Sequence, residues 1–162
     1  MEFLIDVTYF ENFTVIDTDF DANKKLNTHL VDAHKVQVYE LLGKDLYNRL
    51  QTALDTPGSD PDADTLADLS DLKDFTLKAT ELNLIPFLNT PVTAKGTQER
   101  TGNFSQSASG TDRGLRLDKV RALLEVYAMR VRDYIRENSD IYPEYLRCKN
   151  IDQNFYSGIH GV

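Results

Sequence analysis

The feature that most constrains this chain is a regular spacing of apolar residues in its C-terminal third. In the segment LDKVRALLEVYAMRVRDYI, residues 117–135, apolar side chains recur three or four residues apart: Leu117, Val120, Leu124, Tyr127, Val131 and Tyr134. A period near 3.6 residues places such side chains on one face of an α-helix. The segment therefore predicts a long helix that packs this face against the rest of the protein.

Shorter segments upstream carry the same helical pattern. Residues 23–42 and 44–54 predict two helices joined at Gly43, since glycine adopts the left-handed conformation at a helix end without strain. Asp21 is the expected N-cap of the first. The apolar spacing of Leu66, Leu69, Leu72 and Phe75 predicts a third helix, which runs to about Thr80. A short helix is expected at YPEYLRC, residues 142–148.

Three segments predict extended structure instead. Residues 1–20 mix aromatic and β-branched residues with acids, which favours an N-terminal arm. Residues 84–110 combine a proline-broken apolar run with the polar stretch GTQERTGNFSQSASG, and they predict an extended loop or β-hairpin arm ordered by a neighbouring subunit. The tail, residues 148–162, is rich in aromatic residues and is expected to dock on its own core or on a neighbour.

These expectations combine into a mainly α fold class. At 162 residues the chain is long enough to fold as one domain, residues 1–162, without disulfides or metals. We expect a small bundle of about four to five helices that carries the extended arm and the extended termini. The single cysteine, Cys148, excludes an internal disulfide and a multi-cysteine metal site.

The charge of the chain is divided unevenly between its halves. Residues 1–81 contain 17 acidic and 7 basic residues, whereas residues 82–162 contain 9 acidic and 11 basic residues. The acidic balance argues against tight nucleic-acid binding by the whole surface, because that affinity comes mainly from cations that neutralise phosphates. The chain has no apolar run long enough for a membrane helix, and its acidic N-terminus differs from a signal peptide, so we expect a protein that is intracellular or, at most, released by lysis.

None of the motifs that suggest chemistry matches its template fully. The glycines of residues 96–110 lack the lysine and the preceding strand of a phosphate-binding loop. Asp60, Asp62, Asp64 and Asp71 have the spacing of calcium ligands, but Thr65 replaces the required glycine, so we favour a solvated acidic loop with Asp64 as a helix N-cap. We therefore expect no enzymatic activity, no cofactor and no bound metal.

The histidines are also expected to be structural. His29 and His34 are five residues apart, which places them about 140° apart around a helix and prevents them from sharing a metal ion. His160 lies between glycine-containing segments near the end of the chain.

Basic residues gather on the predicted long helix. A solvated face with internal ion pairs, such as Arg121 with Glu125 or Asp118, is the simplest interpretation. The alternative is contact with an acidic partner, which includes the acidic half of an identical neighbour, and DNA is a further alternative. The set comprises Arg113, Arg116, Lys119, Arg121, Arg130, Arg132 and Arg136.

The order of segments resembles a family of phage proteins. The stretch VQVYELLGKDLYNRL, residues 36–50, and the stretch KGTQERTGNFSQSAS leading into the long helix and YPEY are similar to the small head-tail connector, or neck ring, proteins of tailed bacteriophages, including crAss-like phages. The chain departs from that family at residues 76–95, where a longer apolar helix would be expected.

This resemblance implies a non-enzymatic subunit of a ring of about a dozen copies below the portal, through which DNA passes. Its partners would be identical subunits, the portal protein and other neck or tail proteins, and its location would be the virion neck after synthesis in the host cytoplasm. The subunit contacts that we expect on this view are Ile85, Phe87, Arg100, Phe104, Arg130, Arg132, Phe155 and Tyr156. The alternative is a small helical regulatory module that binds protein or DNA as a monomer or dimer, and an enzyme ranks third.

Overall fold

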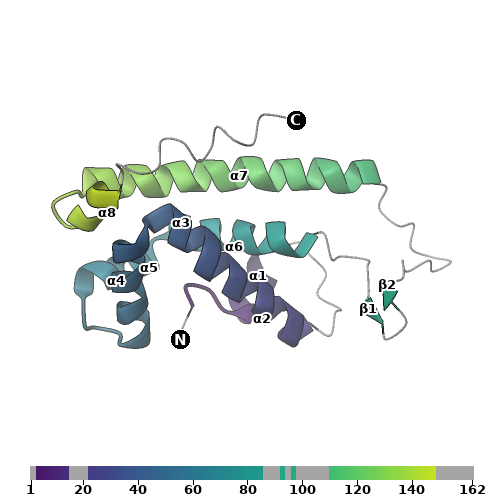
Figure 1. The fold of residues 1–162 in the computed structure, drawn as a ribbon, viewed down its shortest axis with the longest axis horizontal. Helices are drawn as coiled ribbons and strands as arrows, with labels where there is room; N and C mark the ends of the chain where they lie inside the picture. Colours follow the sequence, from purple (N-terminus) through teal and green to yellow (C-terminus); the bar gives the residue numbers. More distant parts are fainter. Residues whose placement is uncertain (1–2, 15–21, 86–91, 94–95, 98–109, 149–162) are drawn as a thin grey trace.

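The protein is built almost entirely from helices, as a computed structural model of the chain shows (Figure 1). The structure describes residues 3–14, 22–85, 92–93, 96–97 and 110–148. In chain order the elements are α1 (Val7–Phe13), α2 (Ala22–Asp32), the π-helix η1 (Ala33–Val38), α3 (Tyr39–Leu42), α4 (Lys44–Asp55), α5 (Pro61–Asp68), α6 (Ser70–Leu84), β1 (Val92–Thr93), β2 (Gly96–Thr97), α7 (Gly110–Glu137) and α8 (Pro143–Cys148). The predicted mainly α fold class is confirmed.

Helix α6 is the centre of the packing. It lies along α7 and also contacts α2, η1 and α5. Figure 1 shows α7 spanning the length of the molecule beside α6, with the continuous helix from α2 through η1 to α3 crossing obliquely. Two groups of buried apolar residues result, one that joins α3, α4, α5, α6, α7 and α8, and one that joins α1, α2 and α6.

The long helix α7 buries the face that its apolar spacing predicts. Val120, Val131 and Ile135 are at most 5% exposed, and Leu124 and Tyr127 pack against the same core while half-buried. Because these positions repeat with the helical period, one stripe of α7 covers the groove between α6 and the other helices.

The predicted joint at Gly43 is also confirmed. Gly43 has φ 76° and ψ 164°, and its N–H donates to the Tyr39 carbonyl oxygen at 2.8 Å while its own carbonyl accepts from Tyr47 N–H at 3.0 Å. One residue thus ends α3 and begins α4, in a backbone conformation that is almost restricted to glycine.

A pair of glycine substitutions tests this assignment. Gly43→Ala is expected to lower the free energy of unfolding by about 2 kcal/mol, because a Cβ atom strains this conformation. Gly114→Ala is the matched control: Gly114 lies within α7, nothing lies within 4 Å of an added Cβ, and alanine should raise the free energy of unfolding by roughly 0.5–1 kcal/mol. Urea unfolding measures both, and equal effects would contradict the assigned role of Gly43.

The N-terminal segment differs from the prediction of an extended arm at residues 1–20. Residues 7–13 form the helix α1, and the Asp6 carboxylate caps it by accepting a hydrogen bond from Tyr9 N–H at 2.7 Å. Phe10 is 0% exposed and packs with Ile5 against α2 and α6. The cap and the burial of these side chains outweigh the β-propensity of the segment.

The third predicted helix is in fact two helices, α5 and α6, separated by Leu69 in an extended conformation. The N-cap of α5 is Asp60 and not Asp64, because its Oδ1 accepts from Asp62 N–H and Ala63 N–H, each at 3.2 Å. Pro61 occupies the first helical turn, where its missing N–H costs nothing, and the cap therefore lies at Asp60, directly before Pro61 and four residues before the predicted Asp64.

If α2, η1 and α3 are counted as one continuous helix, the described residues form seven helices, which is more than the four to five expected. The predicted arm at residues 84–110 begins later, since α6 continues through Leu84. Within it, β1 and β2 pair antiparallel, with Val92 opposite Thr97. The other residues of the arm, the Asp21 cap and the tail beyond Cys148 lie outside the described residues, so those expectations stay predictions.

Candidate functional site

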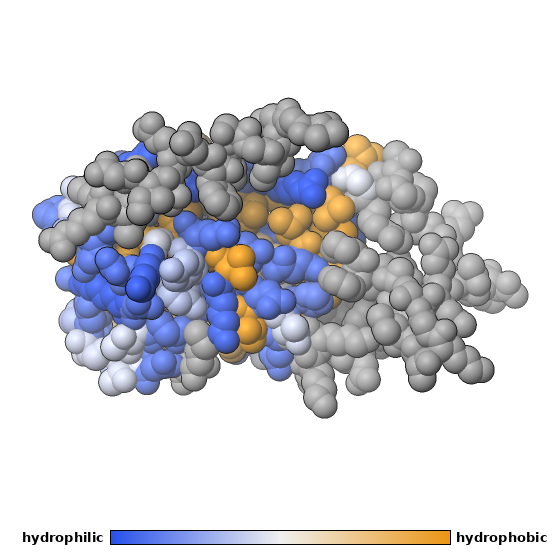
Figure 2. Space-filling view, in the orientation of Figure 1, coloured by the Kyte–Doolittle hydropathy of each residue, from blue (hydrophilic) through white to orange (hydrophobic). Residues whose placement is uncertain are grey.

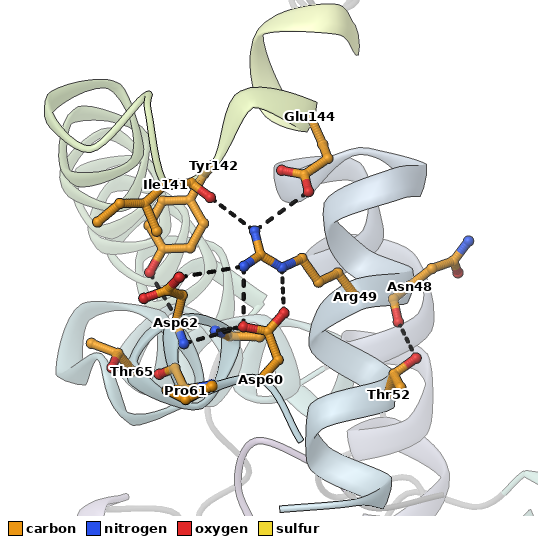
Figure 3. Close-up of polar contacts among 11 residues, drawn as sticks. Asn48, Arg49, Thr52, Asp60, Pro61, Asp62, Thr65, Ile141, Tyr142 and Glu144 are labelled. Carbon is orange, nitrogen blue, oxygen red and sulfur yellow. Dashed lines mark hydrogen bonds and ion pairs between the residues drawn. The ribbon is translucent and has the colours of Figure 1, made fainter. Parts of the chain in front are cut away.

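Arg49 on α4 is the centre of a polar cluster that joins three elements (Figure 3). Its Nε donates to Asp60 Oδ2 at 2.6 Å and its Nη2 to Asp60 Oδ1 at 3.1 Å. Two parallel bonds between a guanidinium and a carboxylate are both strong and directional. Asp60 therefore has two functions, as the cap of α5 and as the partner of α4.

The same guanidinium reaches the segment that precedes α8. Its Nη1 donates to the Ile141 carbonyl at 2.9 Å and lies 3.4 Å from Glu144 Oε1. The Tyr142 ring lies 5.8 Å from the guanidinium carbon, and the Tyr142 hydroxyl donates to the Asp62 carbonyl at 2.9 Å. We call Arg49, Asp60, Tyr142 and Glu144 the Arg49 cluster; it holds α4, α5 and the start of α8 together.

Electrostatics keep Arg49 and Asp60 ionised. The hydrogen bond from Arg49 lowers the pKa of Asp60 to about 2, and the same bond raises the pKa of Arg49. Asp62, which the sequence groups with Asp60 as a calcium ligand, lies 3.7 Å from Arg49. Asp64 accepts from Gly58 N–H at 2.9 Å. In the part of the chain that the structure describes, no group of three or more acidic, histidine or cysteine side chains has metal-binding geometry.

His34 occupies the interior beside this region. It is 0% exposed, its Nδ1 lies 3.1 Å from the Tyr47 hydroxyl, and its ring packs edge-on against Phe3. Burial, assisted by Lys35, lowers the pKa of His34 to about 4. The imidazole is therefore neutral at ordinary pH and belongs to the packed core.

Helix α7 exposes apolar residues on the side that faces away from its core. Leu115, Val126 and Met129 are 64%, 38% and 55% exposed, and Ala122 is exposed between them. At about 100° per residue, these four positions fall within about 60° of arc, opposite the buried stripe. We call them the α7 outer stripe. A helix with apolar residues on two opposite sides is typical of one that is covered on both sides.

Most of the charges beside this stripe form pairs within the subunit. Arg121 lies 3.4 Å from Asp118, and Arg136 lies 3.1 Å from Asp133. Arg130 lies 3.3 Å from Asp71 of α6. The expected pairing of Arg121 with Asp118 is confirmed, and much of the apparent basic character of α7 is neutralised locally.

A second exposed apolar surface lies on the helix formed by η1 and α3. Val36 and Tyr39 are 47% and 39% exposed, and the Tyr39 ring packs edge-on against Tyr47. We call this pair the η1 patch. Exposed Asp32 and Glu40 lie one helical turn from Val36 on the same side. Figure 2 shows hydrophobic side chains at the surface near the middle of this view, among hydrophilic ones.

Three of the interface residues expected from the sequence, Ile85, Arg130 and Arg132, lie among the described residues. Ile85 is 1% exposed, so it belongs to the interior and offers no surface to a neighbour, because α6 continues to Leu84 and carries it inward. The Arg130 side chain is 57% exposed. Arg132 is half-buried near Tyr145 and opposes the rise that burial causes in the Tyr145 pKa. Five of the expected residues lie outside the described residues: Phe87, Arg100, Phe104, Phe155 and Tyr156.

Sequence reasoning missed the Arg49 cluster and the α7 outer stripe. Arg49 is the only arginine between residues 1 and 99, and it lies shortly before the acidic loop at residues 55–65. A lone arginine near a group of acidic residues was the signal in the sequence for this cluster. The outer stripe is present in the sequence as spacings of seven, four and three residues from Leu115 to Met129. The stronger core pattern of the same helix concealed it.

Comparison with known proteins identifies a family but not an activity. Among the described residues, no helix has the length and hydrophobicity needed to cross a membrane. No curated protein and no solved structure matches the chain. A family of unknown function, DUF6712, matches residues 38–154, a region that runs from the end of η1 past α8 and covers most of the chain. The chain therefore belongs to the DUF6712 family.

Proposed function

We propose that this protein is a structural subunit of an oligomeric ring at the head-tail junction of a tailed bacteriophage. In this role it joins the portal to the tail and lets DNA pass without sequence-specific binding. The observation that carries the proposal is the α7 outer stripe, because Leu115 and Met129 are more than half exposed on the longest helix. Such a stripe is covered when subunits associate.

Two further features support a subunit role. The resemblance of residues 36–50 to phage connector proteins covers the joint at Gly43, which the structure places between two packed helices. The Arg49 cluster ties the start of α8 to α4 and α5, so it holds these three elements in fixed positions. A rigid body of this kind suits an assembly subunit.

The DNA-binding alternative receives less support from the geometry. Arg130 and Arg136, which would engage phosphates, lie within 3.3 Å and 3.1 Å of acidic side chains on the same subunit. Phosphate binding would require these cations to exchange partners, and affinity in DNA complexes rises with the number of cations that are available.

The proposal is tested by imaging and by mass. Purified protein, alone and mixed with portal complexes from the phage that encodes it, should form closed rings in negative-stain electron micrographs and a high-mass species by light scattering. A chain that remains monomeric in both samples would overturn the ring proposal. Retention on DNA that is lost when Arg130, Arg132 and Arg136 are replaced together by alanine would instead favour the regulatory module.

A further inference from the structure

We infer that α1 and α2 form a strap that opens from α6 as a unit, by bending at η1 while the rest of the protein stays folded. This opening goes beyond the proposed ring function and does not depend on it. We call residues 3–14 and 22–32 the N-terminal layer. In the closed form the layer covers one face of α6, and in the open form it uncovers the apolar side chains on that face.

Helix α6 separates two clusters of buried side chains. Leu72 and Phe75 of α6 belong to the larger cluster, which joins α6 to α3, α4, α5, α7 and α8. Leu77 and Leu84 belong to the smaller cluster, which joins α6 to α1 and α2. At about 100° per residue, the two pairs of side chains point about 160° apart around α6. The smaller cluster can therefore come apart while the larger one stays packed.

The smaller cluster also contributes less to stability. Among the described residues it contains six buried apolar side chains, against sixteen in the larger cluster, so it buries much less apolar area. Hydrophobic stabilisation is roughly proportional to that area. Segments that bury little apolar surface open at a lower free energy than the whole domain needs to unfold. The N-terminal layer is the part of the described chain that meets this condition.

The continuous helix from α2 to α3 passes from one cluster to the other at η1. Leu26 and Leu30 of α2 lie in the smaller cluster. Leu41 and Leu42 of α3 lie in the larger one. Between them, η1 is a π-helix, a wide and uncommon turn at which helices often bend. The family match begins at Val38, the last residue of η1, so the bend coincides with the start of the family region.

Polar atoms at this bend are incompletely satisfied in the closed form. Gln37 Nε2 donates to Asn83 Oδ1 of α6 at 3.1 Å. His34 Nε2, Gln37 Oε1 and Asn83 Nδ2 are buried and have no hydrogen-bond partner in the described part of the chain. A buried polar atom without a partner destabilises the state that contains it, and opening lets water bond to these atoms. This gain offsets part of the apolar burial that opening loses.

Contacts at both ends of α1 also hold the layer closed. Leu4 is 7% exposed and is the described residue of the layer that inserts into the larger cluster. The Phe3 ring packs edge-on against the His34 ring, with centroids 5.5 Å apart. After α1, the Thr14 hydroxyl donates to Glu81 Oε1 of α6 at 2.8 Å. Leu4 is therefore the latch, because opening has to withdraw it from a cluster that otherwise stays intact.

Two buried thiols on α6 test the opening. In a Cys148→Ser background, which removes the only native thiol, Leu77→Cys and Leu72→Cys are prepared as separate chains. Leu77 and Leu72 are 3% and 0% exposed on the same helix, but Leu77 lies under the layer and Leu72 lies in the larger cluster. The rate of each thiol with dithionitrobenzoate is measured at low protein concentration. Urea unfolding of each variant gives the rate expected if only global unfolding exposes the thiol.

The strap predicts different results for the two thiols. Leu77→Cys should react about tenfold or more faster than its global unfolding allows, whereas Leu72→Cys should react at the rate that global unfolding sets. If Leu77→Cys also reacted only at the rate of global unfolding, the layer would open together with the rest of the protein. That result would overturn the inference.

Adding Leu4→Ala distinguishes release of the layer from a local packing defect. Leu4 lies in the same cluster as Leu72, so a local defect would speed the reaction of Leu72→Cys. Release of the latch should instead speed Leu77→Cys several-fold and leave Leu72→Cys at the rate that global unfolding sets. Faster reaction of Leu72→Cys with no change in Leu77→Cys, or a Leu4→Ala chain that does not fold, would overturn the inference.

A pair of valine substitutions repeats the test with a milder change. Thr14→Val removes the bond to Glu81 Oε1 and keeps the shape of the side chain, so it should speed Leu77→Cys a few-fold. Thr52→Val is the matched control, because the Thr52 hydroxyl donates to the Asn48 carbonyl within α4. The control should leave both thiols unchanged. If both valine variants left Leu77→Cys unchanged, the layer would not be a separable strap.

Discussion

Replacing Arg49 with alanine is expected to lower the free energy of unfolding by about 3 kcal/mol. The substitution removes two bonds to Asp60 and the bond to the Ile141 carbonyl, and it uncovers the Tyr142 ring. The Arg49 side chain is only 22% exposed, so water replaces these contacts incompletely. Urea unfolding at one low protein concentration measures the change as a shift in midpoint with an unchanged slope.

Two variants control for charge and for exposure. Arg49→Lys keeps the positive charge but loses the two-pronged geometry, so it should recover less than half of the lost stability. Arg130→Ala removes the contacts with Asp71 and with the Tyr127 ring from a side chain that is 57% exposed, and its effect should stay below about 1 kcal/mol. If Arg49→Ala and Arg130→Ala proved equally mild, the Arg49 cluster would not be the support assigned to it.

Acidification from pH 6.5 to pH 4 is expected to lower the free energy of unfolding through His34. The folded-state pKa of His34 is about 4, below its ordinary value of 6.5, so the unfolded chain binds a proton first as the pH falls. The contribution of His34 is fully present above pH 6.5 and decreases by up to about 1.4 kcal/mol per pH unit, roughly 3 kcal/mol by pH 4.

Variants distinguish His34 from other groups that titrate. His34→Gln should flatten the dependence in this window, whatever its effect on stability at pH 7. Burial also lowers the pKa of His29, so His29→Gln is measured in parallel. Asp60, with a pKa of about 2, contributes to loss of stability only at lower pH, below its ordinary value of 3.8. A pH profile of the His34 variant that matches the unmodified protein would show that His34 is accessible to protons in the fold.

Both results bear on assembly, because the two groups stabilise connected parts of the same body: His34 Nδ1 lies 3.1 Å from the hydroxyl of Tyr47, which is on α4 with Arg49. His34 lies in η1, directly behind the η1 patch, and the Arg49 cluster holds the start of α8. If η1 loosens at low pH, the patch loses its fixed geometry. Ring stability would then fall over the same pH range as the stability of the subunit.

The elements that the sequence predicts best are those with local causes. The period of α7 and the glycine at residue 43 each act over a few residues, and the structure agrees with both. The predictions that are wrong involve competition between a local preference and distant packing. The β-branched start of the chain forms α1 because Phe10 is buried against α2 and α6, and no feature within residues 7–13 reveals those partners.

The sequence alone determined a mainly helical chain, the buried stripe of α7, the joint at Gly43 and the acidic and basic halves, because periodicity, backbone freedom and charge belong to residues near each other in the chain. Only the tertiary structure decided that Arg49 binds Asp60 and the Ile141 carbonyl, that Ile85 is interior, and that α7 keeps Leu115 and Met129 exposed. These facts depend on which helices pack together. Packing of that kind is set by the combined burial of many side chains far apart in the sequence.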